Sequence, residues 1–240
     1  EPHGFNIGAA AMPNGITNNL HVHFTAEVVL VFDGQYKFRW GPKGASGEWV
    51  GGDGDILSVP TWIFRGFTNV GPDGGMVFTV LGGDDTGGII WDPDILRGAA
   101  QYGLYLRRDG VLVDSATGAA KPADDELIQP ISDQDAKSFQ HWTPERMLAE
   151  RVAPFAARAF ADDALLDSLL PGHGSAMARA IGYGISEQRD GFPPIRAPHG
   201  FSVEWLRLQP GAEAGPFRIS ERMVLMNRSD DVEVTLNRGA

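Results

Sequence analysis

The sequence contains no cysteine, and this absence excludes several kinds of site. Without a thiol the chain cannot form a disulfide bond, use a thiolate nucleophile, hold an iron–sulfur cluster or bind zinc through sulfur. Basic residues are also few, with 20 Lys and Arg against 31 Asp and Glu, so the formal net charge is −11. So acidic a chain repels nucleic acid, which we exclude as a partner. Any bound metal must have nitrogen and oxygen ligands.

Long apolar runs are missing as well. No stretch approaches the roughly 18 apolar residues of a membrane helix. The first residues, EPHGFNIGAA, lack the charged-then-apolar order of a signal peptide. We therefore expect a cytoplasmic protein with no membrane partner. A length of 240 residues, with 42% hydrophobic and 21% charged residues, is typical of a globular chain of one or two domains.

Glycine and proline are frequent and lie between short apolar runs, a pattern typical of strands joined by tight turns. Turn residues such as Asn14-Gly15 and Asp33-Gly34 separate these runs. The first hundred residues therefore predict an all-β sandwich or barrel. The expected strands are Phe5–Met12, His21–Phe32, Gln35–Trp40, Asp55–Pro60, Phe67–Val70, Met76–Leu81 and Ile89–Trp91.

The middle of the chain, residues 101–197, is expected to be a linker with a hairpin and helices. Two short apolar runs, Leu104–Leu106 and Val111–Val113, flank Asp109-Gly110 and predict the hairpin. Thr143 and Pro144 predict the start of a helix that runs to about Arg151. Further helices are expected over residues 162–170 and 175–181.

A short motif then repeats. Pro2-His3-Gly4-Phe5 reappears as Pro198-His199-Gly200-Phe201, and each copy precedes an apolar strand. The repeat predicts a first domain over residues 1–100 and a partial second copy of it over residues 198–240. The second copy has Gly215 and Phe217 at the positions of His21 and His23, so we expect a structural role for it.

The best candidates for metal-binding or catalytic residues lie in the segment LHVHFTAEVVLVFDG. His21, His23 and Glu27 have the same parity, so on one extended strand their side chains would share a face. Two imidazoles and a carboxylate form a ligand set for an octahedral metal with open positions. Such a set is typical of non-haem iron(II) oxygenases, although manganese, nickel or zinc could use it.

Together with the residues around it, this segment resembles the cupin superfamily. The first cupin motif, GxxxxxHxHxxxExxxxxxG, is matched by Gly15, His21, His23, Glu27 and Gly34, and the second is matched in part by Gly54, Pro60 and Asn69. The resemblance implies an all-β cupin barrel, that is, an RmlC-like jelly roll or double-stranded β-helix, with a divalent metal inside, Fe(II) first of all. The repeat makes the chain similar to bicupins such as gentisate or quercetin dioxygenase-like proteins, which implies ring cleavage with dioxygen.

Two positions depart from the second motif. Arg65 replaces its histidine and Trp62 replaces a glycine. A guanidinium stays protonated and has no lone pair to donate, so Arg65 cannot be a ligand. One arrangement keeps the metal on His21, His23 and Glu27 and turns Arg65 toward an anionic substrate. In the other, Arg65 forms an ion pair with Glu27 and takes over the charge of the metal.

Two classes of function remain open. The first is a metal-dependent, dioxygenase-type oxidoreductase acting on a small aromatic or anionic molecule, with Arg65, Trp62 and Asn69 at the substrate and no catalytic residue assigned. An isomerase or lyase of the same fold would differ from it in needing no oxygen. The second is a non-catalytic module that binds a small ligand or scaffolds a dimer. We expect a homodimer and a small-molecule partner.

Overall fold

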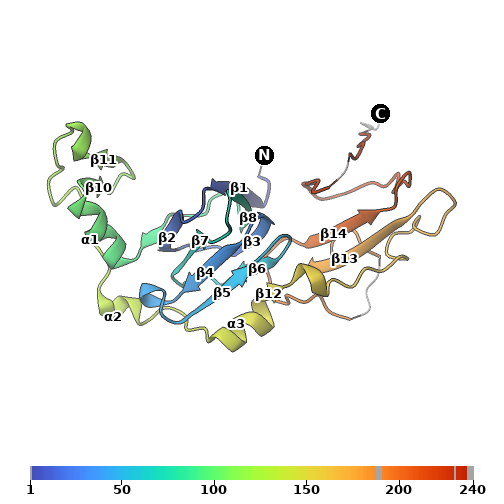
Figure 1. The fold of residues 1–240 in the computed structure, drawn as a ribbon, viewed down its shortest axis with the longest axis horizontal. Helices are drawn as coiled ribbons and strands as arrows, with labels where there is room; N and C mark the ends of the chain where they lie inside the picture. Colours follow the sequence, from blue (N-terminus) through green and yellow to red (C-terminus); the bar gives the residue numbers. More distant parts are fainter. Residues whose placement is uncertain (1, 188–190, 230, 237–240) are drawn as a thin grey trace.

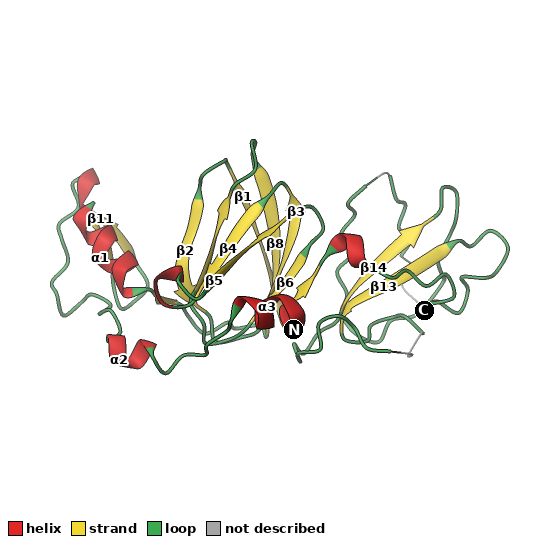
Figure 2. Ribbon diagram, turned by 60° about the horizontal axis from the view of Figure 1, so that its bottom comes forward, coloured by secondary structure: helices red, strands yellow, loops and turns green. Residues whose placement is uncertain are grey.

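Two five-stranded antiparallel sheets form the centre of the computed structural model, which describes residues 2–187, 191–229 and 231–236 (Figure 1, Figure 2). The first sheet contains, in spatial order, β1 (Phe5–Met12), β8 (Gly75–Gly82), β3 (Glu27–Asp33), β6 (Ile56–Val59) and β12 (Val152–Ala153). The second contains β5 (Gly47–Gly51), β4 (Tyr36–Trp40), β7 (Arg65–Asn69), β2 (Thr17–Val22) and β9 (Ile90–Trp91).

The pairing of the first eight strands is nested. β1 pairs with β8, β2 with β7, β3 with β6 and β4 with β5. This pairing, divided between two facing sheets, is the arrangement of a jelly roll. The predicted fold class is therefore confirmed.

Large side chains fill the interior between the sheets. Tyr36, Phe38 and Trp40 on β4 face Val29 and Val31 on β3, and all five are buried. Their alternation along each strand is that of a sheet with one face in the core. Residues of the expected linker also belong to this core, because Trp142, Met147 and Val152 join the same cluster. The linker thus packs as part of the barrel.

The expected strand His21–Phe32 is wrong as a single element. The chain leaves β2 at Val22, bends at Phe24 and Thr25, and begins β3 at Glu27 in the opposite sheet. The apolar run continues through the crossing, so its pattern does not mark the bend. β5 was not predicted.

Helices and turns lie around the barrel. The α-helices are α1 (Pro93–Gln101), α2 (Asp133–Ala136) and α3 (Pro144–Arg151), and the 3-10 turns are η1 (Pro42–Gly44), η2 (Ser115–Thr117) and η3 (Phe155–Ala157). α3 begins as predicted, with the Thr143 hydroxyl accepting a hydrogen bond from the Arg146 amide at 3.3 Å. The predicted hairpin is present as β10 (Leu104–Leu106) and β11 (Leu112–Asp114). No helix in the described part of the chain is long and apolar enough to cross a membrane.

The two later helices that we expected are wrong. Ser175–Ile181 is a strand, β13, which pairs antiparallel with β14 (Val203–Leu208). Six of its seven residues are buried, and a short apolar run covered on both faces cannot be told from a helix by its period. Residues 162–170 form turns, in which Leu165 is buried while Leu166 and Leu169 are exposed.

The β13–β14 hairpin lies at one end of the barrel, and α1 with the β10–β11 hairpin lies at the other (Figure 1). Ile181 and Ile195 pack with Val28 and Ile56 on the outer face of the first sheet. Within the described part of residues 198–236, β14 is the one strand. The division at residues 100 and 197 and the partial second copy stay predictions.

Candidate functional site

His21, His23, Glu27 and Arg65 come from both sheets and lie where the chain crosses between them. His21 is on β2 and pairs with Arg65 at the start of β7, whereas Glu27 begins β3 in the facing sheet. The residues predicted as metal ligands therefore do not share one strand face. Instead the crossing brings Glu27 and Arg65 together from opposite sheets.

Arg65 and Glu27 form a buried ion pair. The Arg65 guanidinium donates from Nη2 to Glu27 Oε2 at 2.6 Å and from Nε to the same oxygen at 3.0 Å. A third bond runs from Nη1 to the carbonyl oxygen of His21 at 2.9 Å. The side chains are only 8% and 7% exposed, respectively. Of the two arrangements that the sequence left open, the structure contains the ion pair.

Burial acts against the charge of each partner. It raises the pKa of Glu27 and lowers the pKa of Arg65 to about 9, because water no longer solvates the charged forms. The short bonds between the two groups oppose these shifts, since each group supplies the countercharge of the other. The interior thus holds a positive and a negative charge that cancel.

The two histidines lie edge to face, with ring centroids 4.9 Å apart and an interplanar angle of 85°. His21 Nδ1 lies 2.6 Å from the carbonyl oxygen of Asn19, which can only accept, so this nitrogen carries the proton. Burial first, and then the charge of Arg65, lowers the pKa of His21 to about 4. His21 is thus neutral near pH 7. His23 Nδ1 is buried and has no hydrogen-bond partner among the described residues.

The residues as folded do not fit a metal held by two histidines and a carboxylate. The imidazoles have lone pairs to offer, but the Glu27 carboxylate is bonded to Arg65. Within the described part of the chain, no group of three or more His, Asp or Glu side chains is placed to hold a metal ion. The guanidinium would also lie beside the metal as a second cation, which is costly in a buried site.

Trp62 and Phe64 precede β7 and pack against Phe139, whereas Arg65, the first residue of β7, contacts Glu27. Trp62 is 44% exposed and its ring packs against Phe24 and Phe139. Its φ of 55° is the left-handed conformation that glycine favours, and glycine is the residue expected here by the cupin motif. Phe64 is buried against Phe139 under the segment that carries α2.

Asn69, also predicted at the substrate, lies at the far end of β7. Its Nδ2 donates to the carbonyl oxygens of Met12 at 2.7 Å and Asp73 at 2.9 Å, and its Oδ1 accepts from the amide of Gly71 at 2.9 Å. These bonds tie the end of β1 to the turn before β8. The structure does not bring Asn69 together with Arg65, which lies four residues, or about 13 Å, along the strand.

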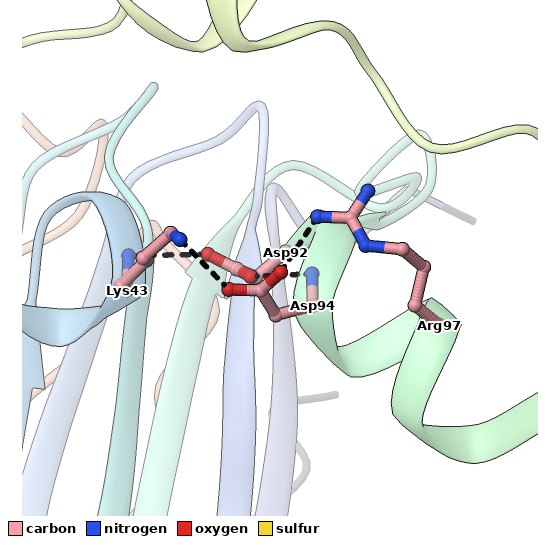
Figure 3. Close-up of polar contacts among 4 residues, drawn as sticks. All are labelled: Lys43, Asp92, Asp94 and Arg97. Carbon is pink, nitrogen blue, oxygen red and sulfur yellow. Dashed lines mark hydrogen bonds and ion pairs between the residues drawn. The ribbon is translucent and has the colours of Figure 1, made fainter. Parts of the chain in front are cut away.

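Trp91 belongs to this site and was not predicted there. It pairs with His21 across β9 and β2, and the two ring centroids are 5.4 Å apart. The next residue, Asp92, caps α1 and is fixed to the η1 turn by the contacts in Figure 3. The sequence did contain a signal for the start of α1, because an Asp followed by a Pro is typical of a helix start.

No family model and no curated protein matches the sequence. Several solved structures are weakly similar. A recombinant oxalate oxidase in complex with glycolate is 20% identical, with 41% of this chain and 51% of that chain covered and a TM-score of 0.35. The DMSP lyase DddQ from Ruegeria pomeroyi DSS-3 is 17% identical, with 37% and 43% covered and a TM-score of 0.33.

An uncharacterized protein with a double-stranded β-helix domain from Klebsiella pneumoniae subsp. pneumoniae MGH 78578 is 18% identical, with 36% and 69% covered and a TM-score of 0.33. The chain spans about half the length of the oxalate oxidase structures that it matches. Because all of these TM-scores are low, nothing about the function of this chain follows from the likeness. The jelly roll is established by the strand pairing.

Proposed function

We propose that this chain is a cupin-type binding module without catalytic metal, in which the Arg65–Glu27 ion pair occupies the place of a metal ion. The observation that carries the proposal is the pair itself, with Nη2 and Oε2 at 2.6 Å and both side chains less than a tenth exposed. A guanidinium can supply positive charge to the carboxylate, but it cannot supply an open coordination position. The proposed module therefore does not bind a substrate or dioxygen at an open coordination position.

The ligand of such a module would be a small aromatic molecule at the rim of the barrel. Phe24, Trp62 and Phe139 offer ring surface there, and Trp62 is 44% exposed. The Trp62 amide lies 3.4 Å from the carbonyl oxygen of His23, so the backbone of the rim is joined to the segment that carries this histidine. Stacking on the exposed face of Trp62 would hold a planar ligand. We also propose that the module forms a homodimer.

Restoring a histidine tests the proposal directly. Arg65→His removes the cation, frees Glu27 and adds a third imidazole beside His21 and His23. We expect the wild type, purified without added metal, to contain less than about 0.1 equivalent of iron, manganese, nickel or zinc, and the variant to take up about one equivalent on incubation with Fe(II) or Mn(II). Arg65→Met is the matched control, because it removes the cation without adding a ligand. About one equivalent of metal in the wild type would overturn the proposal.

A metal-dependent, dioxygenase-type oxidoreductase is the second candidate. The observation in its favour is the pair of adjacent imidazoles, of which His21 is neutral and His23 has an Nδ1 without a hydrogen-bond partner among the described residues. When bound by His21, His23 and Glu27, Fe(II) would supply the redox chemistry, and Arg65 would have to leave Glu27 first. Metal in the wild type that is lost in His21→Ala, together with oxygen consumption in the presence of an aromatic acid, would establish this candidate.

A further inference from the structure

Three arginines gather around shared aromatic rings, on the outside of the barrel where β14 and η3 meet the first sheet. We call Arg158, Arg207 and Arg228 the arginine cluster. The rings that they contact are Phe155, Phe160, Trp205 and Phe32. The cluster is separate from the Arg65–Glu27 pair, which lies inside the barrel.

Arg158 is at the centre of the cluster. Its guanidinium stacks on Phe155 and lies 5.3 Å from the ring centroids of both Phe160 and Trp205. Its Nε donates to the carbonyl oxygen of Phe155 at 2.6 Å. Cation–π contacts and this bond hold the side chain without any carboxylate.

The other two arginines contact rings of the same group. Arg207 lies 4.4 Å from the Phe160 centroid, and Arg228 lies 5.1 Å from that of Phe155. Arg228 is further fixed by a bond from Nη2 to the carbonyl oxygen of Phe32 at 2.8 Å. A Cβ at Gly54 would come within 2.6 Å of Arg228 Nη1, so the absence of a side chain there leaves room for this arginine.

The positive charge of the cluster is not balanced. Arg207 pairs with Asp162 at 3.4 Å, and that carboxylate is 82% exposed. Among the described residues, no carboxylate lies within ion-pair distance of Arg158 or Arg228. The Nε of Arg228 is buried and has no hydrogen-bond partner there. In the part of the chain that the structure describes, two positive charges thus have no carboxylate partner, although the net charge of the chain is −11.

The electrostatic effect is visible on the central residue. Burial first, and then the charges of Arg228 and Arg207, lowers the pKa of Arg158 to about 10. The three cations therefore repel one another, and their repulsion is relieved by an anion placed between them. In an acidic protein such a cluster is not explained by solubility, for which scattered charges suffice.

We propose that Arg158, Arg207 and Arg228 form a binding site for a phosphate group, either free phosphate or the phosphate of a small molecule. Two positive charges with no carboxylate partner among the described residues match an anion of about two negative charges, which phosphate carries near neutral pH. The oxygens of phosphate accept hydrogen bonds on several sides, and one guanidinium group can donate to two of these oxygens at once. The proposal goes beyond the function of the barrel interior and does not depend on it.

Calorimetric titration with inorganic phosphate tests the site, at constant ionic strength and with chloride as the reference anion. We expect saturable binding to the wild type, and a dissociation constant about tenfold or more higher in Arg158→Gln and in Arg228→Gln. Arg146→Gln is the matched control. Arg146 also stacks on an aromatic ring, that of Trp142, but it pairs with Glu150 at 3.2 Å. Binding that is absent from the wild type, or equal in all four proteins, overturns the proposal.

A second measurement separates binding from packing. If the cluster binds phosphate, phosphate raises the thermal midpoint of the wild type more than chloride does, and this rise is lost in Arg207→Gln, whose side chain is 48% exposed and tolerates the change. If the cluster is purely structural, Arg207→Gln lowers the thermal midpoint by the same amount in phosphate as in chloride. This result would contradict the phosphate site. Methyl phosphate distinguishes the sources, because tighter binding than free phosphate assigns the group to a small molecule. Acetate binding as tight as phosphate overturns the assignment.

Discussion

Arg65 reaches the interior of the barrel as a cation and is tolerated there because Glu27 meets it from the facing sheet. Both groups lose nearly all their hydration, a cost of several kcal/mol for each ion. The two bonds to one carboxylate oxygen and the third to the carbonyl of His21 offset that cost. Removing one partner of such a pair is costly, because the other charge stays buried without a countercharge. Replacing both partners by apolar side chains costs little, because no buried charge remains.

This asymmetry gives a prediction for Glu27. We expect Glu27→Gln to lower the free energy of unfolding by about 3–5 kcal/mol, because it leaves the Arg65 cation buried without a countercharge. The double variant Glu27→Leu with Arg65→Met, which replaces both charges by apolar side chains, should lie within about 1 kcal/mol of the wild type. Urea unfolding followed by tryptophan fluorescence measures both. A double variant as unstable as the single one would show that the pair is not an independent unit.

At the residue scale the sequence predicted identities better than geometry. His21, His23, Glu27 and Arg65 were all singled out, and the ion pair was one of two arrangements foreseen. The shared-parity argument was wrong, because the chain changes sheets between Val22 and Glu27. A crossing of this kind depends on tertiary packing and leaves the apolar pattern unbroken.

At the scale of elements, α1 is joined to the barrel by a small polar network (Figure 3). Asp92 Oδ1 accepts from the Asp94 amide at 2.9 Å, and Oδ2 accepts from the Lys43 amide at 3.2 Å. Asp94 pairs with Lys43 Nζ at 3.3 Å and with Arg97 Nη2 at 2.6 Å. Because Trp91 directly precedes the cap, these contacts also hold its ring beside His21.

The two aspartates of this network should differ in importance. We expect Asp92→Ala to cost about 1–2 kcal/mol of unfolding free energy, because the residue is 3% exposed and its loss leaves two backbone amides without an acceptor. Asp94→Ala serves as the control, since it removes only exposed ion pairs, and we expect no measurable loss. Urea unfolding compares them. Equal losses would mean that the cap does not fix α1 to the barrel.

Elements were predictable where local signals and burial agreed. Thr143 and Pro144 mark the start of α3, and β1 has the bounds predicted from its apolar run and the turn that follows it. The helix predicted over residues 175–181 is wrong. The segment is rich in alanine, which favours a helix locally, but it is buried on both faces and pairs with β14. Tertiary contacts of this kind override local preference.

At the scale of the molecule, the repeated Pro-His-Gly-Phe motif joins the C-terminal part to the barrel. The two copies lie side by side, with the rings of Phe5 and Phe201 6.5 Å apart. Their histidines differ, because the His3 side chain is 65% exposed whereas His199 is buried. His199 Nδ1 lies 2.6 Å from the Ala197 carbonyl oxygen and Nε2 lies 2.7 Å from Ser58 Oγ on β6. The two histidines therefore make different contacts, since His3 lies near the exposed Asp84 and His199 is bonded to β6.

This contact makes the stability of the molecule depend on pH. Nδ1 donates to the carbonyl, so Nε2 must accept from the Ser58 hydroxyl, which in turn accepts from Arg151 Nη1 at 3.2 Å. Burial, and to a lesser degree the charge of Arg151, lowers the pKa of His199 below its usual value, although the bond to Ala197 opposes this. Folded His199 is therefore neutral at a pH where unfolded His199, with a pKa of about 6.5, already binds a proton.

Because the unfolded chain binds more protons, the contribution of His199 to stability is present above pH 6.5 and falls as the pH drops below it. We expect the urea midpoint of the wild type to fall further between pH 7.5 and pH 5.5 than that of His199→Gln, since all other groups titrate alike in both. His3→Gln, the same change in the exposed copy of the motif, should follow the wild type. If His199→Gln and the wild type lose stability in parallel, the buried copy of the motif does not couple proton binding to the contact between the C-terminal part and the barrel.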